Sequence, residues 1–585
     1  MSLSRAAYVP AQGRSEAVPS ITQGYIDEAA SALARLGMTH TSVHAIKCPG
    51  TGSGWLRRCL YSTCNLYILP FPDNLMHPYV LGALLVLFSV ANLLTSYLYL
   101  YPTINYCTFP AQPERRDDLK VYPTQYPPFR LLVLGDPQLE GDSSLINLDN
   151  GSFPSLQTLW PDFREGKTMV DRLDVLGSHV RELLTTDLPL ILQSYRKKLD
   201  LFGNDYYLAH IYRTLHWTLL PTHVAVLGDL IGSQWVSDEE FERRGTRYWN
   251  RVFQKGRKVE DEVSSGIHIS SLEDEDAMKG WSRRIINVAG NHDIGYAGDM
   301  TAEKIQRFER VFGKANWETR FSLPLDHIDE ALEPVELRLV VLNSLNLDPP
   351  VLNADLQGET YNFVNSVIGA SKSVEDRTTG TILLTHLPLH KEAGVCVDPP
   401  SFAYHDEEHG GGVREQNHLS HDASKGILEG IYGMSGNPEA DGKGIGRNGI
   451  ILTGHDHEGC DVYHHLPEAD DVSSRTWTAQ KWDAEKWNRT SSAMDKSIPG
   501  IREITVRSMM GDFGGNAGLL SAWFDPSTRE WQFDYSTCAL GKQHIWWAIH
   551  ILDIFTLIFL NYVGWSIFRS TRNAAPLGGE KEKTL

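Results

Sequence analysis

The chain has 585 residues, of which 42% are hydrophobic, and its formal net charge is −19. This length is enough for one large domain or two modest ones. The acidic balance argues against a nucleic-acid-binding protein, because nucleic-acid phosphates would be repelled and the sequence offers no local basic patch.

Residues 1–78 are rich in Ser, Ala, Gly and Pro, and we expect either a disordered region or a wrongly assigned start codon. No apolar core follows Met1, so the chain does not begin like a secretory signal peptide. Residues 59–72 are apolar but too short to cross a bilayer, so they either lie at a membrane interface or pack against the fold.

Residues 79–101 form an uncharged apolar run with Tyr at both ends. A run of this length can span a bilayer, and Tyr is enriched at membrane interfaces. We therefore predict a first transmembrane helix here, with a buried core helix as the alternative. Residues 102–128 would form a linker.

Five short apolar runs follow, and each is predicted to be a buried strand that stops at Gly or at a polar residue. The runs and their polar ends are Phe129–Leu134 before Gly135, Asp136, Pro137 and Gln138; Val224–Leu227 before Gly228 and Asp229; Arg284–Ala289 before Gly290, Asn291, His292 and Asp293; Thr381–Thr385 before His386; and Gly449–Thr453 before Gly454, His455, Asp456 and His457. Each alone could be a strand and an ordinary turn. Their recurrence predicts that Asp, Gln, Asn and His side chains gather at one end of a sheet.

These side chains are a mixed nitrogen and oxygen ligand set without a thiolate. Such a set suits two divalent ions of the Mn, Fe or Zn type better than a structural zinc site, which usually uses Cys.

Between these strands, apolar periodicity predicts two or three helices over residues 167–220 and further helices over 237–253 and 301–312. Residues 391–447 show little periodicity and fall between His386 and His455, so we expect a lid over the metals. His405 and His409 would contact substrate there or belong to a solvated loop. Closing strands are predicted at 502–506 and 519–524.

Residues 545–568 predict a second transmembrane helix, with a Trp pair near one end. Asp553 is costly inside a bilayer, so it would contact the first span, contact a lipid headgroup, or lie near the interface in a tilted helix. Basic residues before the first span and after the second favour cytosolic termini. Residues 129–540 would then be luminal, and residues 569–585 a cytosolic tail.

Two sequons, at Asn150 and Asn488, are candidate glycosylation sites within the predicted luminal part. Near the carboxyl end, Lys581 and Lys583 resemble a dilysine signal for retrieval to the endoplasmic reticulum. The alternative for the tail is a solvated polar segment.

The order of the polar blocks, with GD, then GNHD, then a lone His, then GHDH, resembles the calcineurin-like metallophosphoesterase superfamily. The resemblance covers roughly residues 129–540. It implies an α/β (α+β) four-layer fold, in which a β-sandwich is flanked by helices, and a two-metal centre that hydrolyses phosphoric esters.

Carried over residue by residue, the resemblance implies seven metal ligands and one catalytic residue. The first metal would take Asp136, Gln138, Asp229 and His457, and the second would take Asp229, Asn291, His386 and His455. His292 matches the non-ligand His that stabilises the phosphate or protonates the leaving oxygen.

Gln138 departs from the superfamily, in which His is usual at this position. The carbonyl oxygen of Gln is a harder and weaker ligand than imidazole, so we predict loose binding and a preference for Mn²⁺, with Fe or Zn as alternative metals. In the other interpretation, Gln138 is not a ligand and water fills its place.

The chain has seven Cys, and four of them lie in the predicted luminal part, where disulfides persist. Cys396 and Cys460 each follow a metal-ligand block closely, so we favour a disulfide between them. The alternative is that both are free and buried.

A metallophosphoesterase domain between two spans, with a retrieval-type tail, resembles the endoplasmic-reticulum phosphoesterases that remodel GPI anchors. That branch is manganese-dependent and removes an ethanolamine-phosphate side group from a mannose of the glycan. The resemblance implies GPI-anchored proteins or GPI lipid as substrate, the endoplasmic reticulum membrane as location, and cargo receptors of the early secretory pathway as candidate partners. The alternatives are a hydrolase of another lipid or nucleotide phosphoester, and a non-catalytic metal-binding protein in cargo export or manganese homeostasis.

Overall fold

The computed structural model describes residues 78–112, 127–141, 153–324, 335–467, 476–483 and 500–574. The predicted N-terminal region up to residue 77, the sequon residues Asn150 and Asn488, and the tail lysines Lys581 and Lys583 lie outside the described residues. These parts of the sequence analysis stay predictions.

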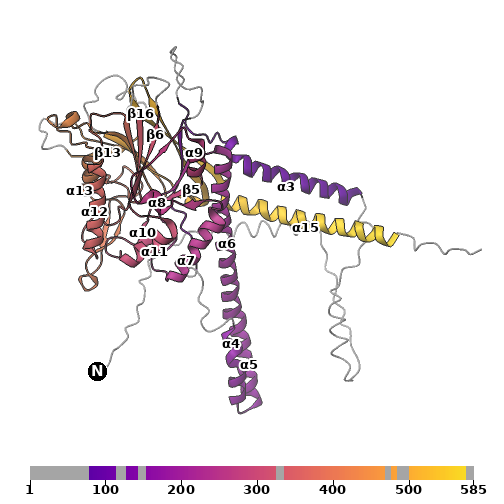
Figure 1. The fold of residues 1–585 in the computed structure, drawn as a ribbon. Helices are drawn as coiled ribbons and strands as arrows, with labels where there is room; N and C mark the ends of the chain where they lie inside the picture. Colours follow the sequence, from indigo (N-terminus) through magenta and orange to yellow (C-terminus); the bar gives the residue numbers. More distant parts are fainter. Residues whose placement is uncertain are drawn as a thin grey trace, which may run out of the picture. The chain divides into compact units, whose positions relative to one another are not determined.

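Two β-sheets form the centre of the described chain (Figure 1). The first has six strands in the order β16-β15-β1-β2-β5-β3, with the bounds β1 (Phe129–Leu134), β2 (His223–Val226), β3 (Arg257–Lys258), β5 (Arg284–Asn287), β15 (Gly514–Asp525) and β16 (Glu530–Lys542). The second has eight strands in the order β13-β12-β14-β11-β8-β7-β6-β4, with the bounds β4 (His268–Ser271), β6 (Trp317–Leu323), β7 (Val335–Leu342), β8 (Thr379–Thr385), β11 (Asn448–Thr453), β12 (Cys460–His465), β13 (Thr478–Lys481) and β14 (Gly500–Thr505).

The two sheets pack against each other through a buried apolar cluster. Phe129 and Val133 of β1 belong to it, together with residues of β7, β8 and β11 in the second sheet. The rings of Phe129 and Phe321 have centroids 5.4 Å apart and join β1 to β6. Leu132 and Leu134 point to the other face of β1 and join a second cluster with a long helix, as the alternation of strand side chains requires. A mixed α/β fold is thus confirmed, whereas the four-layer arrangement stays a prediction.

The sheets are covered by helices that mostly begin at polar caps. Side chains of Ser237, Thr301 and Asn353 accept backbone N–H groups at the starts of α7, α11 and α12. The helices of this part are α7 (Asp238–Arg247) with the π turn η3 (Tyr248–Val252), α8 (Asp261–Ser264), α9 (Glu275–Trp281), α10 (Asn291–Ile294), α11 (Ala302–Phe312), α12 (Ala354–Gly369) and α13 (His421–Gly426) with the π turn η5 (Ile427–Ile431). Short 3-10 turns are η4 (Glu407–His409), η6 (Asp441–Gly444) and η8 (Gly511–Phe513).

One continuous helix joins α5 (Met169–Glu182), the π turn η2 (Leu183–Asp187) and α6 (Leu188–Leu219), because the junction residues keep right-handed helical dihedrals. The sequence predicts two or three helices over residues 167–220, and the structure differs in that α5, η2 and α6 form a single helix. Helix α4 (Pro154–Glu165) packs back on the first part of the long helix, where the buried Asp187 carboxylate accepts the Ser155 N–H at 3.1 Å.

The predicted lid is more regular than the sequence suggests. Residues 391–447 contain the two-stranded ribbon of β9 (Phe402–Tyr404) and β10 (Val413–Gln416), and helix α13. His405 lies 3.0 Å from the Asp299 carboxylate and is part of the fold, whereas His409 is exposed. These elements are too short to produce a clear sequence period, which explains the low periodicity of the segment. Its role as a lid over the metals stays a prediction.

Two helices, α3 (Pro78–Ile104) and α15 (Gln543–Ala574), lie side by side (Figure 1). Both are long and apolar enough to cross a membrane, judged by length and composition. Only 11% of the most apolar window of each is buried, which argues against a core helix. Thr95 Oγ1 of α3 lies 3.0 and 2.9 Å from the two carboxylate oxygens of Asp553, so this acid contacts the first apolar helix.

Two disulfides connect distant parts of the described chain. One joins Cys396 to Cys460, the pair favoured by the sequence, and the other joins Cys107 to Cys538. The second bond connects the segment after α3 to β16, the strand directly before α15. The two apolar helices are thereby covalently joined where they meet the sheets.

Candidate metal centre

The five strands with polar ends deliver those ends to one region. β1, β2 and β5 run parallel in the first sheet, and β8 and β11 run parallel in the second. The two sheets meet there, because Gly454 N–H donates to the His386 carbonyl at 3.1 Å and the His386 ring lies 2.7 Å from the Leu227 carbonyl. The carboxyl ends of parallel strands share one sheet edge, so loops of both sheets converge on one site.

Four of the predicted ligand residues have left-handed backbone conformations that favour glycine. The residues are Asp136 (φ 40°), Gln138 (φ 43°), Asp229 (φ 49°) and His455 (φ 73°). Such conformations cost energy in non-glycine residues and cluster at functional sites. The loops therefore trade stability for the direction in which these side chains point.

Three predicted ligands form a compact set. Ligand atoms of Asp229, His386 and His455 all lie within 4.8 Å of one another. Asn291 joins them, since its Oδ1 is 2.9 Å from His386 Nε2. This brings together all four residues predicted for the second metal.

The ring nitrogens of both His residues are arranged for metal binding. His386 Nδ1 faces the Leu227 carbonyl, and His455 Nε2 lies 3.0 Å from the Gln416 carbonyl. Because a carbonyl can only accept, each of these nitrogens carries the proton, and the other nitrogen keeps its lone pair. His386 Nε2 and His455 Nδ1 are thus the nitrogens that would hold a cation.

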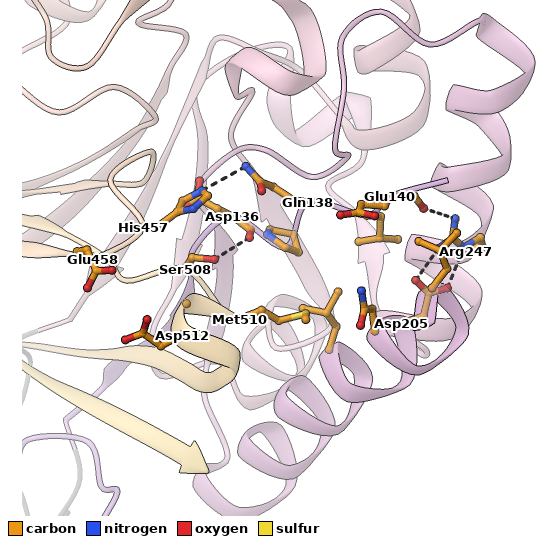
Figure 2. A pocket seen from close by; sticks show the side chains of 16 residues that line it. Asp136, Gln138, Glu140, Asp205, Arg247, His457, Glu458, Ser508, Met510 and Asp512 are labelled. Carbon is orange, nitrogen blue, oxygen red and sulfur yellow. Dashed lines mark hydrogen bonds and ion pairs between the residues drawn. The ribbon is translucent and has the colours of Figure 1, made fainter. Parts of the chain in front are cut away.

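The remaining predicted ligands lie beside this set. Gln138 Nε2 is 3.1 Å from Asp229 Oδ2. It is also 3.2 Å from His457 Nε2, as Figure 2 shows. A half-turn of the amide brings its carbonyl oxygen to the same place, so Gln138 fits a ligand position. Asp136 Oδ1 accepts the His455 N–H at 3.2 Å, whereas its Oδ2 is buried and has no hydrogen-bond partner in the described chain.

The electrostatics of the site fit divalent cations. Burial, together with the charge of Asp229, raises the pKa of Asp136 well above its ordinary value. Burial, together with the neighbouring His386, lowers the pKa of His455 to about 3, and burial lowers the pKa of His386. Neutral imidazoles are the metal-binding form, and a cation would compensate the crowded carboxylates. The residues present therefore fit the two-cation group that the resemblance implies.

His292 occupies a separate position from the ligands. Its backbone N–H donates to Asp229 Oδ1 at 2.9 Å, and its Nε2 lies 3.8 Å from Asp229 Oδ2. The side chain is 37% exposed, in contrast to the buried Asp229, Asn291 and His386. This exposure lets His292 contact a substrate oxygen next to the bridging carboxylate, as its predicted role requires.

Asp293 is a supporting residue that the sequence analysis did not assign. Its buried carboxylate accepts N–H groups of Gly290 at 2.8 Å, Ile231 at 3.0 Å and Leu230 at 3.2 Å. It thereby fixes the loop after β5 against the loop after β2. The sequence did carry a signal for this role. Asp293 is the third residue of the helical turn that follows Gly290, a position from which an acidic side chain can accept free backbone N–H groups.

A second supporting cluster lies behind the second sheet's ligands. The buried Glu503 on β14 binds Lys391 Nζ at 3.0 Å and the His464 ring on β12. It also accepts the Leu389 N–H at 3.0 Å. Glu503 thus connects the chain after His386 to the strand after the GHDH block, a long-range contact that local patterns do not reveal.

A pocket of about 280 Å³ opens beside the predicted first metal position (Figure 2). Asp136, Gln138 and His457 line one end, and Asn204 and other residues of α6 line the other. Asn204 Oδ1 accepts a hydrogen bond from Gln543, the first residue of α15, at 2.7 Å. The pocket therefore extends from the candidate metal centre to α6, and one of its α6 residues is hydrogen-bonded to the start of α15.

No family model matches the chain. Among known proteins, it is 33% identical over 417 residues to Protein TED1 of Saccharomyces cerevisiae, covering 63% of this chain and 79% of that protein. Metallophosphoesterase 1 of Danio rerio is 24% identical over 323 residues, covering 52% of this chain and 71% of that protein. The chain belongs to the family of Protein TED1, and the similarity to Metallophosphoesterase 1 makes this family metallophosphoesterase-like. An uncharacterized protein of Schizosaccharomyces pombe, C23A1.02c, is 27% identical over 388 residues, covering 61% and 79% of the two chains.

Membership of the metallophosphoesterase family indicates a phosphoric ester hydrolase that uses divalent metal ions. Bound cations in such a site act as Lewis acids on a phosphoryl group and activate water. Two residues of the chain are placed to support this chemistry. Asp229 lies between the two ligand groups, and His292 can donate a proton to a leaving oxygen. The assignment of each ligand to one metal stays a prediction.

Proposed function

We propose that this metallophosphoesterase is a phosphodiesterase of the endoplasmic reticulum membrane that removes an ethanolamine-phosphate side group from a mannose of GPI anchors. The pocket carries the proposal, because it joins the candidate metal centre to α6 at the start of α15. A substrate that is held in the bilayer by its own lipid would approach from this side. Attachment of enzyme and substrate to one membrane raises their effective concentration.

Further support comes from the two apolar helices and the two disulfides. Helices α3 and α15 suit a protein with two spans. The disulfides Cys107–Cys538 and Cys396–Cys460 lie in the part predicted to be luminal, and disulfides persist in the oxidising lumen but not in the cytosol. Removal of the side group would assist export of GPI-anchored proteins, with cargo receptors of the early secretory pathway as partners of the product.

Metal use follows from the ligand set. Carboxylate and amide oxygens at Asp136, Gln138 and Asn291 favour manganese more than the imidazole-rich sets of zinc enzymes. We propose two manganese ions, with Asp229 as the bridging ligand and His292 as the general acid.

The test is the mass of GPI glycans from cells that lack the protein, rescued with wild type, with Asp229→Asn, or with Asp422→Asn. Asp422 is a matched control, since it is a fully exposed carboxylate on α13 that does not line the pocket. We expect an additional ethanolamine phosphate on loss, and its removal by wild type and by Asp422→Asn but not by Asp229→Asn. Glycans of identical mass in all cells would contradict the proposed substrate.

A further inference from the structure

The long helix formed by α5, η2 and α6 carries a row of exposed apolar side chains. The row, termed the apolar stripe, consists of Met169, Leu173, Leu176, Val180, Leu184, Leu188, Leu192, Tyr195, Leu199, Phe202 and Tyr206. Successive members are three or four residues apart, so they lie on one face of the helix. Each is at least 37% exposed. At about 1.5 Å per residue, the stripe is roughly 55 Å long.

The π turn η2 (Leu183–Asp187) helps to keep the stripe on one face. From Val180 to Leu192 the stripe takes three consecutive steps of four residues. In a regular α-helix each such step drifts by about 40° around the axis. A π turn contains more residues than an α-turn and offsets part of this drift.

The stripe points away from the sheets. On the opposite face of α6, Leu201 and Leu208 are buried in the fold, and Lys197 binds Glu140 at 2.7 Å. Every member of the stripe stays at least 37% exposed in the described chain, although an apolar surface of this length is rare in a protein without a partner.

One end of the stripe adjoins the two apolar helices. Next to Phe202, Gly203 packs directly against the indole of Trp547 in α15, and the His210 ring lies 4.9 Å from the Tyr99 ring of α3. Figure 1 shows α6 crossing the ends of α3 and α15, with α4 and α5 farther out along the same long helix. The stripe therefore runs outward from the level at which the two apolar helices leave the sheets.

The part of the stripe near α15 has the composition of a membrane interface. Lys198 lies over the Tyr195 ring at 5.5 Å, and Arg251 lies over the Phe202 and Tyr206 rings at 5.3 and 5.4 Å. Aromatic rings with basic side chains beside them are typical of helices that rest among lipid headgroups. This chemistry favours a lipid surface over a second protein helix, whose seam would be aliphatic.

We propose that the apolar stripe lies in the interfacial region of the same bilayer that α3 and α15 cross, so that the long helix rests along the membrane surface. The inference rests on the membrane attachment in the proposed function. It goes beyond attachment, because contact along roughly 55 Å of helix would fix how the domain is oriented over the bilayer. The pocket, which the opposite face of α6 helps to line, would then be held on the side of the long helix that faces away from the lipid.

The test places a single fluorophore on the full-length protein in phosphatidylcholine nanodiscs. Cys48, Cys59 and Cys64 are first changed to Ser, since the other four Cys are in disulfides. New labelling sites are Leu192→Cys and Leu199→Cys on the stripe. Matched controls are Gln193→Cys and Asp200→Cys, which are exposed neighbours about 100° around the helix. Quenching is measured with headgroup spin-labelled lipid and with aqueous iodide.

We expect lipid quenching at the two stripe sites to exceed that at their neighbours by at least about twofold, because an interfacial helix buries its apolar face about 5–10 Å into the lipid. Equal lipid quenching at stripe and neighbour sites, with full access to iodide, would overturn the proposal. Protection of the stripe from both quenchers would also overturn it and would indicate a second copy or another protein on the stripe. A label at Leu557→Cys, exposed near the middle of α15, tests membrane attachment separately with acyl-chain spin-labelled lipid: without lipid quenching there, the proposed function fails as well.

Discussion

At the scale of single residues, Gln138 is predicted to decide how the first metal is held. Its amide lies beside both Asp229 and His457, where an imidazole would be usual in the superfamily. We predict that Gln138→His tightens metal binding and shifts the preference from manganese towards zinc or iron, because imidazole is a softer and stronger ligand than an amide oxygen. Metal content after dialysis against equal concentrations of the three metals measures this shift.

Gln480→His provides the matched control for that experiment, since this Gln lies on the edge strand β13 and does not line the pocket. Metal content that is the same in Gln138→His and wild type would show that Gln138 is not a ligand.

The glycine before His455 is required by close packing. A Cβ at Gly454 would lie 2.4 Å from the Leu227 carbonyl and 3.0 Å from Asp136 Oδ1. We predict that Gly454→Ala pushes apart the loops after β1, β2 and β11 and lowers hydrolysis of a small phosphodiester by about 10- to 100-fold, as the loss of ligand support does in other metal sites.

Gly358→Ala is the corresponding control, because the space around Gly358 in α12 is open. Ala favours a helix over Gly by about 1 kcal/mol, so this variant should be as active as wild type and slightly more stable. Equal activity of Gly454→Ala and Gly358→Ala would show that the loops can accommodate the methyl group.

At the scale of elements, Glu503 holds β14, β12 and the chain after β8 together. Burial alone would raise its pKa, but Lys391 and His464 lower the pKa to about 2. We predict that Glu503→Gln reduces the free energy of unfolding by about 3–5 kcal/mol, because it leaves the buried Lys391 without its partner. Denaturant titration measures the loss, with the exposed Glu408→Gln as control.

The same ion cluster predicts a pH dependence. A carboxylate whose pKa is lower in the folded than in the unfolded chain stabilises the fold above the unfolded value of 4.5. This contribution is lost as the pH falls from that value towards about 2. The stability difference between wild type and Glu503→Gln should shrink over this range, and a constant difference would contradict the assignment.

The sequence predicted the short strands and the helices α7 and α11 better than the long helix, for local reasons. Each apolar run ends at a Gly or polar residue, so the end of β1 at Leu134 and the end of β11 at Thr453 could be placed from the pattern. The single long helix could not be placed from the pattern, because a Pro such as Pro189 usually ends or kinks a helix. The structure passes this point through the π turn η2, which ends directly before α6.

The same distinction holds for the candidate site. Its predicted ligands follow strands and are brought together by the parallel order of those strands. The supporting contacts of Lys391 with Glu503 and of Asn204 with Gln543 join residues far apart in the chain, and no local pattern points to them. The exposure of the apolar stripe could not be predicted for another reason. Apolar periodicity predicts a buried helix face, and here that face is exposed.

At the scale of the whole molecule, the compartment of the domain can be read from its thiols. Under denaturing conditions without reductant, a maleimide should label only three of the seven Cys, namely Cys48, Cys59 and Cys64. Reduction should raise the number to seven, because both disulfides open. Seven labelled Cys before reduction, counted by intact mass, would place the domain in a reducing compartment and contradict a luminal location.

The Cys107–Cys538 bond has a mechanical consequence. The bond lies three residues after α3 and five residues before α15, so it closes a ring that contains both sheets. Tension that draws the two apolar helices apart passes through the disulfide and the short segments beside it. Most of the ring of chain that the disulfide closes carries none of this tension, so the candidate metal centre is shielded from it.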